Sequence, residues 1–232
     1  MFKPITLAIV LVVFFSGYWF YKNLVTPEHG STVRVTNLPW QITVVDDQTL
    51  HVLELDVGKA TLGDAVKILK SEYNLAWFEN EDDSISLEAF FIRVSMSGLR
   101  AKVLLELDAS NLEKDYLLKN SGKPEIQGSR TIKYPVDDLA QSLNNRLIRS
   151  LTYVPLSNLD PEMIQSRFGL AEEKLAVDEN TEFWLYPQKG LVISISKRGK
   201  EVFQYIPVGN FHRLKQSIMA TIEHAQQLKK TD

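Results

Sequence analysis

The chain of 232 residues contains no cysteine, which excludes disulfides, thiolate zinc sites, a cysteine nucleophile and a lipid-modified cysteine. It also lacks an excess of positive charge, because 26 Lys and Arg stand against 29 Asp and Glu, for a net charge of −3. A basic footprint for nucleic acid is therefore missing, and we expect no nucleic-acid partner. The apolar share of 44% is typical of a folded domain rather than a disordered chain.

The motifs of nucleotide binding and covalent catalysis are absent as well. The sequence has no P-loop, no G-x-G-x-x-G stretch, no G-x-S-x-G elbow and no H-E-x-x-H pair among its four histidines. We therefore expect no enzyme activity, no cofactor and no metal site. The one acidic run, residues 79–84, is interpreted as a solvated turn. Calcium binding is the less favoured alternative, because the central glycine and final glutamate of an EF-hand are missing.

An uncharged run lies near the N-terminus. Together with Pro4 it spans residues 4–21, close to the roughly 20 residues that cross a membrane as a helix. Lys3 precedes it in a short positive tail, which favours a cytoplasmic N-terminus and a body on the periplasmic side. The sequence thus predicts a single-pass inner-membrane protein with a transmembrane anchor in residues 1–24. A cleaved signal peptide is the alternative, but Phe15-Ser16-Gly17 offers a poor cleavage site.

Beyond a polar linker, residues 25–32, segments with strand and helix patterns alternate. Thr61 and Asp160 each begin a short helix with an apolar face, and each helix precedes a run of strands separated by polar turns. We predict an α+β fold in which two similar units of short helices pack on antiparallel β-meanders. The expected divisions are a first unit, 33–120, a connecting helical segment, 121–150, and a second unit, 151–232, with a closing amphipathic helix over 211–228.

Part of the second unit shows a family resemblance. Leu159-Asp160-Pro161-Glu162-Met163-Ile164, then Phe168-Gly169, Phe183-Trp184-Leu185-Tyr186 and Gly190-Leu191-Val192-Ile193-Ser194-Ile195 resemble the SmpA/OmlA-type (BamE-like) module. The resemblance covers residues 159–206. Leu170 stands where that family often has proline, and the family's lipidated cysteine is absent. The resemblance implies a non-enzymatic envelope domain that meets other proteins.

The aromatic strand of this segment supplies the candidate contact site. Alternation places Trp184 and Tyr186 on one strand face, opposite Phe183 and Leu185. Large aromatic side chains dominate binding hot spots, so Trp184 and Tyr186 are candidates for a partner contact, with internal packing as the alternative. The basic turn residues Lys197, Arg198 and Lys200 are candidates for steering an acidic partner.

We therefore expect a membrane-anchored, non-enzymatic module that binds a protein partner in the cell envelope. An anchored small-ligand sensor and a hydrolase are the alternatives. An apolar surface patch or an unpaired strand edge would favour the first, an apolar cavity the second, and a polar cluster inside a pocket the third.

Overall fold

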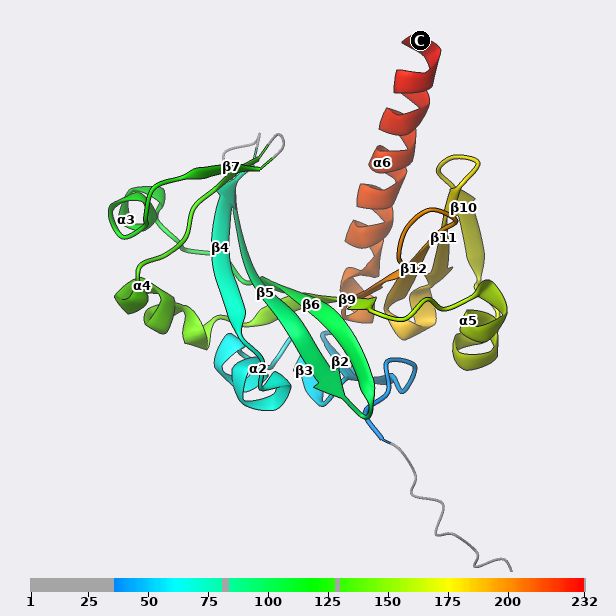
Figure 1. Ribbon diagram of the computed structural model, residues 1–232, viewed down its shortest axis with the longest axis horizontal. Helices are drawn as coiled ribbons and strands as arrows, with labels where there is room; N and C mark the ends of the chain where they lie inside the picture. Colours follow the sequence, from blue (N-terminus) through cyan, green and yellow to red (C-terminus); the bar gives the residue numbers. More distant parts are fainter. Residues whose placement is uncertain (1–35, 81–83, 128–129, 232) are drawn as a thin grey trace, which may run out of the picture. The chain divides into compact units, whose positions relative to one another are not determined.

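The computed structural model describes residues 36–80, 84–127 and 130–231. From Thr36 onward the chain belongs to one compact unit. Its main element is a single antiparallel sheet with the strand order β10-β11-β12-β13-β9-β6-β5-β4 (Figure 1). The strands are β4 (Tyr73–Glu79), β5 (Ile85–Met96), β6 (Leu99–Leu107), β9 (Ile148–Pro155), β10 (Glu173–Ala176), β11 (Thr181–Tyr186), β12 (Leu191–Ser196) and β13 (Val202–Tyr205).

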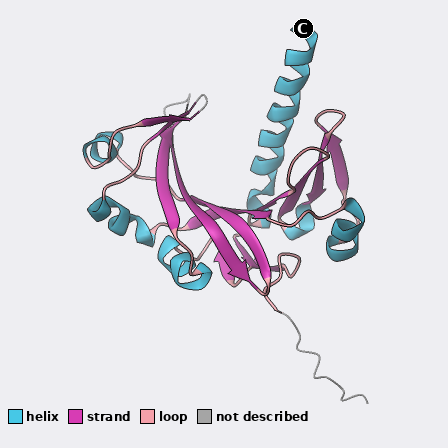
Figure 2. Cartoon of the chain, viewed as in Figure 1, coloured by secondary structure: helices cyan, strands magenta, loops and turns pink. Residues whose placement is uncertain are grey.

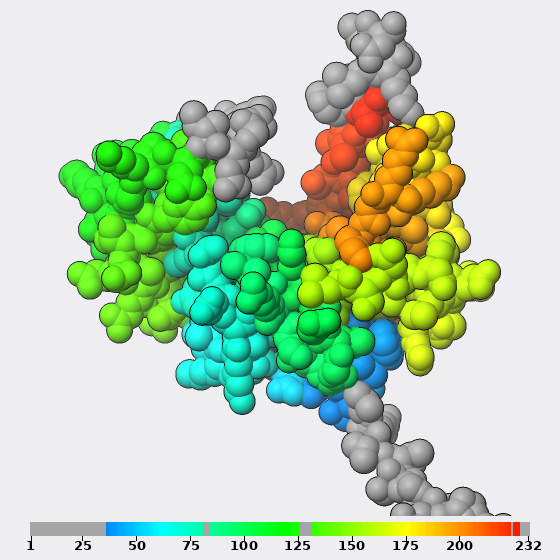
Figure 3. Space-filling view, viewed as in Figure 1, coloured from blue at the N-terminus to red at the C-terminus, as the bar shows by residue number. Residues whose placement is uncertain are grey.

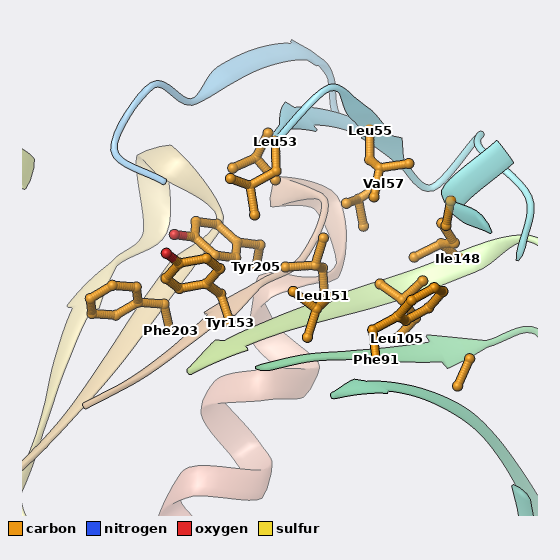
Figure 4. Close-up of a cluster of buried hydrophobic side chains, with 14 of the residues drawn as sticks. Leu53, Leu55, Val57, Phe91, Leu105, Ile148, Leu151, Tyr153, Phe203 and Tyr205 are labelled. Carbon is orange, nitrogen blue, oxygen red and sulfur yellow. The ribbon is translucent and has the colours of Figure 1, made fainter. Parts of the chain in front are cut away.

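One face of this sheet is covered along its length. A small antiparallel sheet of β1 (Thr43–Asp46), β2 (Thr49–Val52) and β3 (Leu55–Val57) packs there, together with α2 (Leu62–Leu69) and α5 (Pro161–Phe168) (Figures 1 and 2). Their apolar side chains form the large core cluster with those of the main sheet. Figure 4 shows part of it, where Leu55 and Val57 of β3 face Leu105, Ile148 and Leu151 of the sheet.

Local chemistry explains where the two helices on this face begin. At α2, Thr61 and Asp64 form a capping box, because the Thr61 hydroxyl accepts from the Asp64 N–H and the Asp64 carboxylate accepts from the Thr61 N–H. At α5, the carboxylate of Asp160 accepts from the Met163 N–H at 2.7 Å, and Pro161 occupies the first helical position. Both starts lie where the sequence predicts them.

Glycine is required within the small sheet, where the chain leaving β3 passes the turn between β1 and β2. Gly58 has φ +98°, and a Cβ there would lie 1.9 Å from the Gln48 carbonyl oxygen. The Gly58 N–H donates to the Ile148 carbonyl oxygen of the main sheet at 2.8 Å, and Tyr205 of that sheet donates its hydroxyl to the Pro39 carbonyl oxygen at 2.9 Å. These two hydrogen bonds hold the first part of the chain against the covered face.

Among the described residues, the opposite face of the main sheet is buried only towards its two ends. At one end α6 (Phe211–Thr231) packs on β11 and β12, with Phe211, Ile218 and Ile222 against Leu185 and Val192. At the other end lies a hairpin of β7 (Glu125–Gln127) and β8 (Arg130–Ile132), after which Lys133 exchanges backbone hydrogen bonds with Trp77 at the edge of β4. The remaining elements are α3 (Lys114–Lys119), α4 (Asp137–Ser142) and three short 3₁₀ turns, η1 (Leu143–Asn145), η2 (Pro187–Lys189) and η3 (Val208–Asn210).

The structure confirms an α+β fold with antiparallel strands, but the predicted fold class is otherwise wrong. Instead of two separate meander units, one continuous sheet runs through both, because β9 pairs with β6 on one edge and with β13 on the other. β9 itself crosses the boundary placed at residue 150. The segment 121–150, expected to be helical, also contains the β7–β8 hairpin.

The predicted transmembrane helix, residues 4–21, lies outside the described residues, as do the linker, residues 25–32, and the first three residues of the expected first unit, 33–35. Among the helices that the structure describes, none combines the length and the apolar character needed to cross a membrane.

Candidate functional site

Titratable groups of the described residues do not gather into a reaction centre. No group of three or more His, Asp or Glu side chains in that part of the chain is placed to hold a metal ion. His51 and Asp56 of the small sheet are paired, with Nδ1 and Oδ1 2.6 Å apart, but each side chain is 44% exposed. The pair thus lacks the water-excluded surroundings in which catalytic groups act.

Glu79, the first residue of the acidic run considered for calcium binding, forms ion pairs with two lysines. Glu79 pairs with Lys114, and its second oxygen lies 3.9 Å from the Lys133 ammonium. The hydrogen bond from Lys114 lowers the pKa of the Glu79 carboxyl. Asn80 bonds to Ser84 and Ser86 as in a turn, and residues 81–83 lie outside the described part.

A small pocket lies between α3 and α4. Its volume is about 230 Å³, and it is lined by Asn111, Leu112, Glu113, Tyr116, Leu139, Ser142, Leu143 and Arg146. Ligand sites usually offer ~300–1,000 Å³. This pocket also lies to one side of the two meanders, so it is not the apolar cavity between units that a small-ligand sensor was expected to have.

The predicted aromatic contact pair lies inside the molecule. Trp184 is 3% and Tyr186 4% exposed, and both belong to the large core cluster. Phe183 and Leu185 point to the other face, beneath α6, so the predicted alternation is present. Both sides of β11 are buried, because α5 lies on one and α6 on the other. This burial removes Trp184 and Tyr186 from the surface that a partner can reach.

The buried rings of Trp184 and Tyr186 lie near lysine side chains and backbone carbonyls. The Lys174 ammonium lies 3.6 Å from the centroid of the Trp184 ring. Tyr186 donates its hydroxyl to the Gly169 carbonyl oxygen, and Lys189 donates to that of Phe168, so both satisfy the C-terminal end of α5. Burial raises the pKa of Tyr186 to about 12.

The basic turn between β12 and β13 is exposed, but two of its cations bind backbone. Lys197 donates to the Glu179 carbonyl oxygen, and Lys200 donates to that of Leu156. Arg198 bonds to the Ser196 hydroxyl through its backbone N–H. The turn therefore ties neighbouring loops together while its three side chains keep their positive charge.

The surface that sequence reasoning missed is the middle of the partly covered sheet face, which we call the open face. Register places Phe90, Leu104, Thr152 and Gln204 in one row across β5, β6, β9 and β13, continuous with Val192 under α6. All four side chains are only partly buried. Val154 and the 38% exposed Ile92 lie close to this row, so the open face has an apolar centre.

Two structures border the open face. On the β4 side, Lys133 pairs with Trp77 at the sheet edge, so that Ile132 and Tyr134 pack beside Ala76 and Phe78. On the β12 side stands α6, whose Lys215 binds Glu173 of β10, farther from the open face. The space-filling view shows the surface hollowed between these borders (Figure 3).

Charge changes sign along the open face. Glu88 and Glu106 lie directly opposite each other, two residues along their strands from Phe90 and Leu104, and the Ser150 hydroxyl donates to Glu106 at 2.7 Å. On the other side of the row Lys102 faces Val154, and Arg100 lies two residues farther along the same strand face. The face is thus acidic at one end, apolar in its centre and basic at the other end.

A sequence signal for this face exists in β6. Its inward positions, Ala101, Val103, Leu105 and Leu107, alternate with outward Arg100, Lys102 and Glu106, but the outward series also contains Leu104. The outward Phe90 of β5 is its cross-strand neighbour. An apolar residue between charges on the outer face of two adjacent strands indicates a surface that is covered by something else.

No protein-family model, curated protein or solved structure significantly matches this chain. The resemblance of residues 159–206 to a BamE-like module therefore remains a prediction.

Proposed function

We propose that this chain is a non-enzymatic module of the cell envelope that binds a partner protein on the open face of its sheet. The observation that carries the proposal is the partly exposed apolar pair of Phe90 and Leu104 on a sheet whose other face packs against the main core. Sheets with one apolar and one solvated face usually place polar residues outward, whereas exposed apolar patches mark interaction sites.

The location is part of the same proposal and has its own support. The uncharged residues 4–21 favour attachment to the inner membrane with the body on the periplasmic side. Reporter fusions after residue 30 and after residue 232 test it: both are expected to be active only outside the cytoplasm. Activity of either fusion in the cytoplasm would contradict this location.

Site-specific photo-cross-linking in cells tests the binding surface. A photoreactive amino acid at Leu104 is expected to give a discrete adduct with another protein. The same probe at Leu170 is the matched control, because Leu170 is 77% exposed and follows α5 on the other side of the sheet. Absence of a protein adduct from Leu104, or identical adducts from both positions, would refute the proposal.

A substitution separates contact from folding. Leu104→Asp is expected to abolish the adduct captured from a probe at Val154 while costing only about 1 kcal/mol of unfolding free energy, since Leu104 is partly buried and lies outside the large core cluster. Leu170→Asp is the control variant and is expected to leave the adduct intact.

A further inference from the structure

The shape of the open face limits what can occupy it. Its four uncovered strands, β5, β6, β9 and β13, are adjacent in the sheet, and three strand spacings of ~4.8 Å give a floor about 14 Å wide. An α-helix with its side chains is ~10–12 Å across. One helix therefore fits on this floor alongside α6.

A second copy of this chain cannot pack its open face against this one without steric or electrostatic conflict. If the two-fold axis runs across the strands, opposite charges meet, but α6 of one copy lies over α6 of the other. If the axis runs along the strands, α6 avoids its counterpart, but the Glu106 ends of both copies meet, and so do the Lys102 ends. The first arrangement is therefore excluded by the overlap of the two α6 helices, and the second by the repulsion between like charges.

The geometry points to one amphipathic helix of a partner protein as the occupant of the open face, with basic residues at the Glu106 end and acidic residues at the Lys102 and Arg100 end. This inference rests on the proposed function and specifies its partner chemistry. The apolar side of the helix covers Phe90, Leu104 and Val154, the arrangement of a helix laid in an apolar groove.

The spacing of the charged ends sets the length of the helix. Glu106 and Lys102 are separated by four strand residues, about 14 Å, and Glu106 and Arg100 by six, about 20 Å. At 1.5 Å per helical residue, the opposite charges on the helix lie about nine to thirteen residues apart. A helix of three to four turns meets this requirement.

Three labelled synthetic peptides test the charge pattern against the full-length chain in non-ionic detergent. They share one leucine face, and their charged ends are acidic and basic, both acidic, or both basic. Fluorescence anisotropy is expected to show the acidic-and-basic peptide binding about fivefold more tightly than the other two at low salt, and less so at high salt.

Charge reversal in the chain provides the matched variants. Glu106→Lys makes both ends of the face basic and is expected to favour the peptide with two acidic ends, whereas Lys102→Glu is expected to favour the peptide with two basic ends. Leu104→Asp is expected to weaken the binding of all three peptides. Equal affinities, an unchanged ranking in the charge-reversed chains, or no binding at all would overturn the inference.

The natural adduct from Leu104 distinguishes this inference from the function on which it rests. If mass spectrometry maps the adduct to an extended segment or to a second copy of this chain, the helix is refuted. A heteromeric adduct on an extended segment leaves the protein-binding function in place, whereas the absence of any protein adduct refutes that function itself.

Discussion

The two faces of the eight-stranded sheet are built from the same strands, yet they differ in how they are covered. On the face toward α2, α5 and the small sheet, nearly every inward side chain is buried, Phe91, Leu105 and Leu151 completely. On the face toward α6, burial is limited to the ends, and Phe90 and Leu104 in the middle remain partly exposed. The comparison shows that one face belongs to the core, whereas the apolar centre of the other stays partly exposed among the described residues.

The adjacent residues Phe91 and Phe90 give the strongest test of this difference. Phe91→Ala removes a fully buried ring stacked on Tyr73 and is expected to cost about 3–5 kcal/mol of unfolding free energy. Phe90→Ala removes a partly buried ring and is expected to cost about 1 kcal/mol. Urea unfolding of both full-length variants measures the contrast. Equal losses would show that the open face belongs to the core.

A second test asks whether β11 is buried on both of its sides. Trp184→Ala is expected to lower the unfolding free energy by about 3–5 kcal/mol, because the ring lies in the large core. Lys174→Ala, which removes only the cation above that ring, is expected to cost about 0.5–1 kcal/mol. A near-neutral Trp184→Ala that abolished partner capture would instead restore Trp184 as a contact residue.

The buried tyrosines of the covered face make the stability of the protein depend on pH. Burial raises the pKa of Tyr153 and Tyr186 to about 12, and that of Tyr205 well above its usual range. The unfolded chain loses these protons near pH 10, so stability is complete below pH 10 and falls as the pH rises toward 12. Each tyrosine contributes about 1.4 kcal/mol per pH unit in that window.

The control for this pH dependence removes only the ionisable hydroxyl of one tyrosine. Tyr153→Phe is expected to keep the ring stacked on Phe203 while flattening the fall in unfolding free energy between about pH 10 and 12. An unchanged slope would show that Tyr153 does not couple folding to its ionisation.

Local signals in the sequence predicted local structure well. Thr61 with Asp64, and Asp160 with Pro161, begin helices in the structure because their caps involve only near neighbours in the chain. The opposite orientation of Phe183 and Trp184 also followed from strand alternation. These features depend on backbone periodicity alone, which the sequence contains directly.

Long-range pairing was beyond the reach of those signals. The merger of two expected units depends on β9 meeting β6 and β13, and β13 lies some fifty residues away from β9 in the chain. The burial of Trp184 depends on α5 and on Lys174 of the neighbouring strand β10, contacts that strand alternation alone does not specify. The open face was missed for the same reason, because the row of Phe90, Leu104, Thr152 and Gln204 exists only once four separate strands are in register.

The smallest expected effect tests the cap of α2 on the covered face. Thr61→Ala removes the hydroxyl that accepts from the Asp64 N–H and is expected to cost about 1 kcal/mol in urea unfolding. The Thr61 N–H, and then its hydroxyl, hydrogen-bond the Asp64 carboxylate and lower its pKa. The stability from this ionised group is therefore present above the usual aspartate pKa and is lost as the pH falls through the lowered value. Thr61→Ser keeps the cap and should remain close to the parent chain at both neutral and acidic pH, whereas a loss equal to that of Thr61→Ala would mean that the methyl group of Thr61, rather than its hydroxyl, stabilises the helix.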